Sequence, residues 1–241
     1  MPLTRVAPIL PPILVFDLDG TLAETAGDLI GSLNVILERE RIAPVSLADG
    51  REMVGAGGRA LIQQGFKAAG RAVDPDRLEV LFQDYLAQYE SRIAQESHLF
   101  PGVVATLDRF EAAGWRFAVC TNKVEGPSLM LLRELGVAQR FGAICGQDTF
   151  KVDGQPISKP DPRALTMTID RAGGDLARAV MIGDSKTDIH TAQAAGIPVV
   201  AVDFGYTDAP VHTFAPDRII SSFDSLWDAV ESLKIGANVG A

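Results

Sequence analysis

The chain has 241 residues, which is long enough for one large domain or for a core domain with a smaller insertion. Hydrophobic residues make up 47% of the chain and charged residues 22%, a balance typical of globular proteins that excludes an intrinsically disordered chain. The formal net charge of -9 argues against binding to nucleic acids or anionic membranes, because both need a basic surface.

The two cysteines and the N-terminal segment limit the cellular context. Cys120 and Cys145 each lie within an apolar run, so we expect a buried, reduced pair rather than a disulfide framework or a thiolate metal site. Residues 1–12 contain no apolar run of signal-peptide length, and no later segment approaches the length of a membrane span. We therefore expect a cytoplasmic protein without nucleic-acid or membrane partners. The sequence makes no prediction of the oligomeric state.

The first predicted strand covers residues 13–16 and leads directly into Asp17 and Asp19. Alternate side chains of an extended chain share a face, so the two carboxylates can converge just beyond the strand. Open α/β sheets bind ligands at the carboxyl ends of their parallel strands. Two close carboxylates repel one another unless a cation lies between them, and Mg²⁺ is the natural candidate. The alternative is an ordinary strand that ends in an Asp-Gly turn.

The region that follows predicts only helices. Apolar residues recur at helical spacing over residues 24–41, over a segment that follows the glycine-rich stretch 55–58 and extends to Ala69, and over residues 76–93. No strand pattern occurs between these helices. We expect an α-helical cap domain at residues 23–98, inserted into a core domain made of residues 1–22 and 99–241.

From residue 101 onward, helices alternate with apolar strands, which predicts βαβ units and a parallel sheet. The predicted helices cover residues 103–113, 126–135, 162–172, 187–195 and 225–233. The predicted strands cover residues 116–120, 143–145, 179–183 and 198–202, with a weaker one near Ile219, a hairpin turn at Asp153-Gly154 and frayed residues at 236–241. The expected fold is α/β: a Rossmann-like three-layer core with a central parallel sheet, plus the inserted α-helical cap.

Polar residues follow several of these strands. Thr121 and Asn122 follow the strand 116–120, Lys159 lies in a loop before a helix, and Asp184 and Asp188 follow the strand 179–183. Each position also has a structural interpretation: an exposed surface lysine for Lys159, and helix caps for the threonine and the acids. The prolines on either side of residue 161 favour a fixed position for the lysine over a mobile one.

The order of these residues resembles the four motifs of the haloacid dehalogenase superfamily of phosphotransferases. The first motif of that superfamily, DxDGT, is matched by Asp17, Asp19, Gly20 and Thr21, and the resemblance covers the whole chain. It implies that Asp17 attacks phosphorus and forms an aspartyl-phosphate, which divides one difficult displacement into two easier ones. It also implies that Asp19 protonates the leaving oxygen and then activates the hydrolytic water.

The resemblance further implies a Mg²⁺ cofactor and a phosphate site. The protein ligands to the metal would be Asp17, the backbone carbonyl of Asp19, Asp184 and, as an orienting or occasional ligand, Asp188. The phosphate would be held by Lys159, which also neutralises Asp17, and by Thr121 with the backbone amide of Asn122.

The presence of Asp19 favours phosphoryl chemistry over dehalogenation, because the dehalogenases of the superfamily do not need this second acid. A phosphatase acting on a small phosphorylated metabolite is the preferred interpretation. A sugar-phosphate phosphatase or phosphomutase and a catalytically silent binding module are the alternatives. Within the superfamily, the chain is most similar to the phosphoglycolate phosphatases in cap size, in the glycine-rich cap loop and in GDSKTD at 183–188, but it carries Ala23-Glu24-Thr25 where relatives often have an Asp-Ser pair.

Arg59 follows the glycine-rich loop of the cap. Glycines permit close backbone approach, and a planar guanidinium can bind an anionic group at two points, so we expect Arg59 to bind the far end of the substrate. The alternative is an interhelical turn with an exposed arginine.

Overall fold

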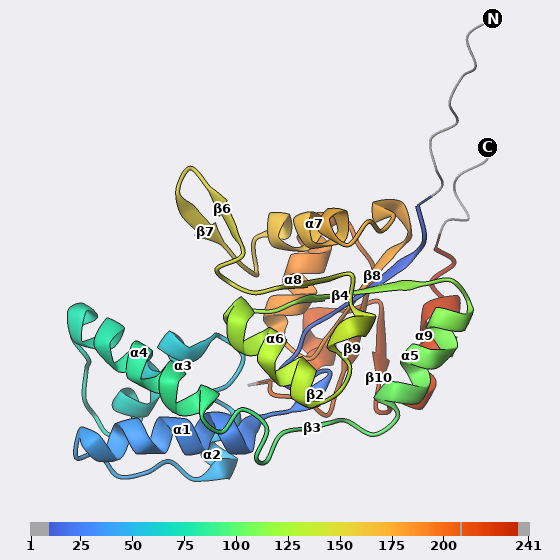
Figure 1. Ribbon diagram of the computed structural model, residues 1–241. Coiled ribbons are helices and arrows are strands. Elements are labelled where there is room, and N and C mark those ends of the chain that lie inside the picture. The colour runs from blue at the N-terminus through green and yellow to red at the C-terminus, as the bar shows by residue number, and fades with distance from the viewer. Residues whose placement is uncertain (1–9, 208, 236–241) are drawn as a thin grey trace, which may run out of the picture.

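The computed structural model describes residues 10–207 and 209–235, and its centre is a six-stranded parallel sheet (Figure 1). The strand order is β10-β9-β8-β1-β4-β5, and every neighbouring pair in it is parallel. The strands are β1 (Ile13–Phe16), β4 (Arg116–Cys120), β5 (Ala143–Cys145), β8 (Ala179–Gly183), β9 (Val199–Val202) and β10 (Arg218–Ile220). The predicted α/β class and central parallel sheet are therefore confirmed.

Helices cover both faces of this sheet. Leu14 and Phe16 of β1 belong to one buried cluster, whereas Ile13 and Val15 belong to a second, because successive side chains of a strand point to opposite faces. The first cluster also contains residues of α5 (Val103–Ala112), α6 (Glu125–Glu134) and α9 (Leu226–Glu231), and the second contains residues of α7 (Pro162–Arg171) and α8 (Lys186–Ala195). The core thus has the three predicted layers. The apolar runs of the four inner strands β1, β4, β8 and β9 are buried on both faces, whereas Ile219 of the edge strand β10 is exposed.

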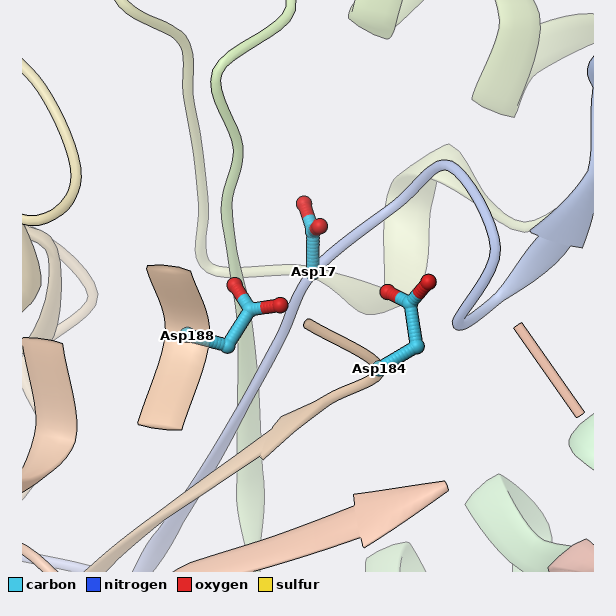
Figure 2. Close-up of side chains that lie close together, drawn as sticks. All are labelled: Asp17, Asp184 and Asp188. Carbon is cyan, nitrogen blue, oxygen red and sulfur yellow. The ribbon is translucent and has the colours of Figure 1, made fainter. Parts of the chain in front are cut away.

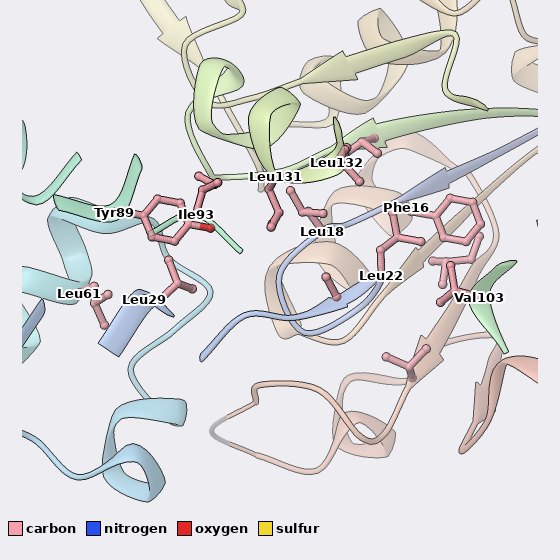
Figure 3. Packing of buried hydrophobic residues seen from close by; sticks show 14 of the residues in the cluster. Phe16, Leu18, Leu22, Leu29, Leu61, Tyr89, Ile93, Val103, Leu131 and Leu132 are labelled. Carbon is pink, nitrogen blue, oxygen red and sulfur yellow. The ribbon is translucent and has the colours of Figure 1, made fainter. Parts of the chain in front are cut away.

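Four helices follow β1 in sequence and lie beside the core in Figure 1. They are α1 (Ala26–Arg39), α2 (Leu47–Arg51), α3 (Gly58–Ala68) and α4 (Pro75–Glu90). Their apolar faces join the cluster that contains Phe16, so one hydrophobic cluster continues from Leu61 and Tyr89 of these helices to Leu18 and Leu22 of the core (Figure 3). A short antiparallel ribbon of β2 (Ala23–Glu24) and β3 (His98–Leu99) connects the two groups of elements.

The structure differs from the predicted elements at several ends. Helix α1 begins at Ala26 rather than at residue 24, because Ala23 and Glu24 pair with the strand β3. The strands β2 and β3 and the five-residue helix α2 were not predicted, since elements this short contain no full period. Helix α9 ends at Glu231 rather than at residue 233. The prediction of frayed residues at 236–241 lies outside the described residues.

The remaining elements are a hairpin and four short 3₁₀ helices. Strands β6 (Phe150–Val152) and β7 (Gln155–Ile157) pair antiparallel, and Asp153 and Gly154 between them have φ angles of 51° and 77°, which confirms the predicted turn. The 3₁₀ helices are η1 (Ala138–Arg140), η2 (Leu176–Arg178), η3 (Val211–Phe214) and η4 (Phe223–Ser225).

Neighbouring strands of the sheet carry the two cysteines. Cys120 and Cys145 lie opposite one another in the register of β4 and β5, and both are buried free thiols, as predicted. Among the residues that the structure describes, no helix is long and apolar enough to cross a membrane.

Candidate active site

Asp17 stands at the carboxyl end of β1, in the middle of the sheet. Its backbone N–H donates to the carbonyl of Ile182 at 2.9 Å, which extends the pairing of β1 with β8 by one residue. The N–H of Leu18 donates to Asp17 Oδ1 at 2.7 Å. The residue is only 6% exposed. The sheet therefore fixes both the backbone and one carboxylate oxygen of Asp17.

The turn after Asp19 depends on a glycine. Gly20 has a φ of +82°, and a Cβ atom there would lie 2.4 Å from Asp184 Oδ2. Any larger residue would collide with that carboxylate as well as strain the backbone. The next residue, Thr21, donates from Oγ1 to Asp184 Oδ1 at 2.8 Å. The Gly-Thr pair thus holds Asp184 against the loop that follows β1.

Three carboxylates meet just beyond the carboxyl ends of the inner strands β1 and β8 (Figure 2). Asp17, Asp184 and Asp188 are all buried, and one oxygen from each lies within 4.8 Å of the others. Burial raises the pKa of Asp17 from 3.8 to about 6, although the neighbouring Lys159 acts to lower it. Burial, together with Asp188 and Asp17, raises the pKa of Asp184 well above its usual range. The fold therefore holds negative charge where it is costly.

Lys159 is the cation of this cluster. Its Nζ lies 2.9 Å from Asp17 Oδ1 and 2.5 Å from Asp188 Oδ1. The residue is 4% exposed, which rules out the interpretation as a surface lysine. Burial acts to lower the pKa of Lys159, but Asp17 and Asp188 outweigh it and raise that pKa above its usual range. Three carboxylates face one ammonium group, so two negative charges of the cluster have no cationic partner among the described residues when all three are ionised.

Asp188 has a structural role as well. Its Oδ2 accepts from the N–H of Ser185 at 3.1 Å and from Ser185 Oγ at 2.6 Å, and the pair forms a capping box at the start of α8. The helix-cap interpretation therefore holds for one oxygen of Asp188, while the other oxygen contacts Lys159. Both arrangements fix the side chain in a single orientation.

The side chain of Asp19 points to a different partner. Lys123 Nζ lies 3.0 and 3.1 Å from the two carboxylate oxygens of Asp19, and 4.2 Å from the centre of the Tyr89 ring. Lys123 is 8% exposed. Lys123 was not among the predicted site residues, although its position directly after Thr121 and Asn122 at a strand end is a signal that could have indicated it.

Thr121 and Asn122 complete the sheet edge beside Lys159. The N–H of Thr121 donates to the Cys145 carbonyl at 3.0 Å, and its Oγ1 accepts from the N–H of Lys123 at 3.2 Å. Asn122 Nδ2 donates to the Lys159 carbonyl at 3.2 Å, whereas its Oδ1 is buried and has no partner among the described residues. The hydrogen bond from Asn122 therefore links the polar residues after β4 directly to the loop that carries Lys159.

A cavity of about 40 Å³ lies between this edge and the helices α3 and α4. Its lining includes Asp17, Asp19 and Thr121 of the core, together with Gly57 and Tyr85 from the helical side. The cavity is wide enough for a few water molecules or a ligand of similar size. The helical side thus forms one wall of the cavity.

Arg59 does not line this cavity. Its Nε and Nη2 bind Glu79 at 2.6 and 2.8 Å, and its guanidinium carbon lies 3.7 Å from the centre of the Phe82 ring. Two donors of its guanidinium are thus bound by Glu79, and its side chain is 41% exposed. The geometry matches the alternative of an exposed arginine and does not support a contact between Arg59 and the substrate.

Tyr206 is a second residue that the sequence analysis missed. Its backbone N–H donates to Asp184 Oδ2 at 2.6 Å, and its hydroxyl accepts from the N–H groups of Thr25 and Ala26 at 2.6 and 3.0 Å. The same hydroxyl donates to Glu24, which Arg51 of α2 binds at 2.5 Å. No local pattern marks a tyrosine that lies 22 residues beyond its carboxylate partner.

The family of the chain follows from comparison with known proteins. The family model described as haloacid dehalogenase-like hydrolase matches residues 14–202, a span that contains the whole carboxylate cluster. The chain belongs to this family. Phosphoglycolate phosphatases of Mesorhizobium japonicum and Caulobacter vibrioides are 51% and 45% identical to it. The match to the first relative covers 89% of this chain and 92% of that relative. The match to the second covers 87% of this chain and 86% of that relative.

Solved structures of the haloacid dehalogenase-like hydrolases have the same architecture. A predicted phosphoglycolate phosphatase from Haemophilus somnus superimposes with a TM-score of 0.82 at 26% identity, covering 90% of this chain and 97% of that one. A haloacid dehalogenase-like hydrolase from Bacteroides fragilis has a TM-score of 0.77 at 27% identity, covering 90% and 99%. The family resemblance seen in the sequence motifs is thereby confirmed.

Proposed function

We propose that this haloacid dehalogenase-like hydrolase is a Mg²⁺-dependent phosphatase that hydrolyses a small phosphomonoester of the phosphoglycolate type through an aspartyl-phosphate on Asp17. The observation that carries the proposal is the position of Asp17, held at the sheet edge between Lys159 and two further carboxylates and facing a small cavity. The names of the relatives from Mesorhizobium japonicum and Caulobacter vibrioides support phosphoglycolate as the substrate.

The residues present fit a magnesium ion. Asp17, Asp184 and Asp188 offer carboxylate oxygens, the ligands that Mg²⁺ prefers, and the two uncompensated charges of the cluster match a divalent cation. We propose Asp17, the backbone carbonyl of Asp19 and Asp184 as protein ligands, with Asp188 in an orienting or occasional role. When bound, the ion would neutralise charge on the phosphoryl group and bring it to the anionic nucleophile.

The reaction assigned to the chain has two steps. In the first, a carboxylate oxygen of Asp17 bonds to phosphorus, the ester bond breaks, and Asp19 gives a proton to the leaving oxygen. In the second step, Asp19 takes a proton from a water molecule, and the oxygen of that water bonds to phosphorus. The bond between phosphorus and Asp17 breaks, which releases inorganic phosphate and restores the Asp17 carboxylate. Lys159 would hold Asp17 in place and neutralise the phosphoryl oxygens, and Thr121 with the Asn122 amide would bind one of those oxygens.

The helical segment would act as a cap over this site. We propose the division expected from the sequence: a cap at residues 23–98 and a core at residues 1–22 and 99–241. The ribbon of β2 and β3, where the chain crosses between the two groups of elements, is the place for a hinge. Closure would exclude bulk water during the transfer to Asp17.

The proposal is tested by measuring phosphate release from a panel of small phosphomonoesters, with and without Mg²⁺. The panel consists of phosphoglycolate, 2-hydroxyethyl phosphate, a hexose phosphate and an aryl phosphate, and EDTA provides the metal-free control. We expect Mg²⁺-dependent release that is fastest with phosphoglycolate and absent from Asp17→Asn. An isomerised sugar phosphate instead of free phosphate would indicate a mutase, and binding without turnover would indicate a silent module.

A further inference from the structure

Two buried hydroxyl groups on α4 have no hydrogen-bond partner in the part of the chain that the structure describes. Tyr85 and Tyr89 are 2% and 1% exposed, and neither hydroxyl makes a hydrogen bond to any described residue. Their rings are stacked in parallel, with centres 6.3 Å apart. A buried hydroxyl without a partner costs about 1–3 kcal/mol, so two adjacent ones indicate a hydrogen-bonding partner other than the residues that the structure describes.

Both tyrosines line the cavity that contains Asp17 and Asp19. Figure 3 places Tyr89 where the helical and core residues of the shared hydrophobic cluster meet. Burial raises the pKa of each phenol above its usual range, so both hydroxyls keep their protons and can donate. An acceptor bound inside this cavity would satisfy both hydroxyls.

Lys123 supplies positive charge at the same place. Among the described residues that line the cavity, it is the only cation, and it stands beside Tyr89 as well as against Asp19. Its single carboxylate partner is Asp19, so the three donors of its ammonium group are not exhausted. An ammonium group and two phenols around one small space form a donor set for an anion.

We propose that Lys123, Tyr85 and Tyr89 form a subsite for a carboxylate on the leaving group of the substrate. This inference rests on the proposed phosphatase function and narrows the substrate class to phosphate esters of short hydroxy acids. Lys123 contacts the acid that protonates the ester oxygen, so a carboxylate one carbon beyond that oxygen comes within reach of its ammonium group.

The size of the cavity supports a short substrate. The cavity that Lys123, Tyr85 and Tyr89 line together with Asp17 and Asp19 has a volume of about 40 Å³, which favours a short leaving group over a bulky one. The subsite also replaces the role that the sequence suggested for Arg59, whose guanidinium is held by Glu79 outside the cavity. Recognition of the anion is thus assigned to α4 and the end of β4, not to the start of α3.

The experiment compares phosphoglycolate with 2-hydroxyethyl phosphate, in which a CH₂OH group replaces the carboxylate. The selectivity is the ratio of kcat/KM for the two esters, measured for the wild type and for Lys123→Met, Tyr85→Phe and Tyr89→Phe. We expect the ratio to fall about tenfold or more for Lys123→Met and about threefold or more for each phenylalanine variant, because charged hydrogen bonds are the stronger ones. The fall should appear mainly in KM for phosphoglycolate.

Two further variants serve as controls for loss of a positive charge. Lys151→Met removes an exposed lysine of β6, and Arg59→Met removes the arginine of the cap. Neither should change the selectivity ratio. A fall in the ratio for Arg59→Met with no fall for Lys123→Met would overturn the proposed subsite. Thermal denaturation of each phenylalanine variant separates recognition from folding, because no hydrogen bond of the protein is removed and the melting temperature should not fall.

Failure of the subsite and failure of the proposed function give different results. If the wild type hydrolyses an aryl phosphate with Mg²⁺ but shows no preference for phosphoglycolate over 2-hydroxyethyl phosphate, the subsite is refuted and the phosphatase function stands. If no ester is hydrolysed, the function is refuted, and calorimetric binding of the two esters to the same variants decides the subsite. Equal affinity of the wild type for both esters would then refute it.

Discussion

Replacing Asp17 by asparagine should stabilise the metal-free protein at neutral pH while abolishing its turnover. The carboxylate of Asp17 is buried beside Asp184 and Asp188, and Lys159 cannot neutralise all three. An asparagine keeps the size of the side chain and an oxygen that can accept the N–H of Leu18, but it removes one buried negative charge. Lys159 retains Asp188 as its partner.

The magnitude follows from the pKa of Asp17. Burial raises this pKa from 3.8 to about 6, so between these pH values the folded protein holds a proton that the unfolded chain releases. The contribution of Asp17 to the free energy of unfolding therefore falls as the pH rises through this window. A rise in pKa from 3.8 to about 6 corresponds to a loss of about 3 kcal/mol in the free energy of unfolding. This loss is complete once the pH exceeds the folded-state pKa. The asparagine variant, which does not titrate, should escape this loss.

The assay is urea denaturation in EDTA at several pH values from 4 to 8. Asp17→Asn and the wild type should have similar free energies of unfolding near pH 4, and the variant should be more stable by about 3 kcal/mol near pH 8. The control is Asp170→Asn, which changes an exposed carboxylate on α7. A difference between Asp17→Asn and the wild type that does not grow with pH would refute the reasoning.

Added Mg²⁺ should stabilise the wild type more than the Asp17→Asn variant. Turnover of the variant should fall by about a thousandfold or more, which is a loss of about 4 kcal/mol in transition-state stabilisation.

Three further substitutions test the surroundings of the cluster. Asp184→Asn should leave the protein folded but raise the Mg²⁺ concentration for half-maximal activity about tenfold or more, measured by metal titration; an unchanged titration would remove this residue from the metal site. Tyr206→Phe leaves two backbone amides at the start of α1 without their acceptor and should cost about 1–3 kcal/mol in urea denaturation, whereas Tyr85→Phe, which breaks no hydrogen bond, should cost nothing. Gly20→Ala should lower stability by about 1–2 kcal/mol from backbone strain alone, and by more through the clash with the carboxylate of residue 184; a denaturation midpoint equal to that of the wild type would contradict the assigned turn.

The centre of the sheet could be predicted from the sequence because its four inner strands are buried on both faces. Each strand of this kind is a nearly continuous apolar run, and residues 13–16 and 179–183 are two such runs with acids directly after them. The hairpin turn could be predicted because only a few residue pairs adopt two successive left-handed conformations. The strands β2 and β3 could not, since two residues have no period and their pairing depends on where the helical segment returns to the core.

The sequence alone did not show which cation would bind the leaving group, the role that we propose for Lys123. Arg59 and Lys123 both stand beside polar or glycine-rich loops, and their local patterns are equally consistent with an anion site. The difference lies in long-range contacts: Glu79 is 20 residues from Arg59, and Asp19 is 104 residues from Lys123. Both cations have a carboxylate partner, but only Lys123 lines the cavity, and this position depends on distant segments that only the folded chain brings together.

The same charges account for both the cost and the use of this site. Buried carboxylates without enough cations destabilise a fold, and here they are held by contacts that leave them no other orientation: the capping box for Asp188, and the Thr21 hydroxyl with the Tyr206 amide for Asp184. These contacts come from the core, whose apolar strands supply the stability that the carboxylates reduce. A protein selected for stability alone would replace the cluster with apolar side chains. Its position at the edge of the sheet, facing a cavity with unpartnered hydroxyls, is therefore best explained by binding of a cation and an anionic substrate.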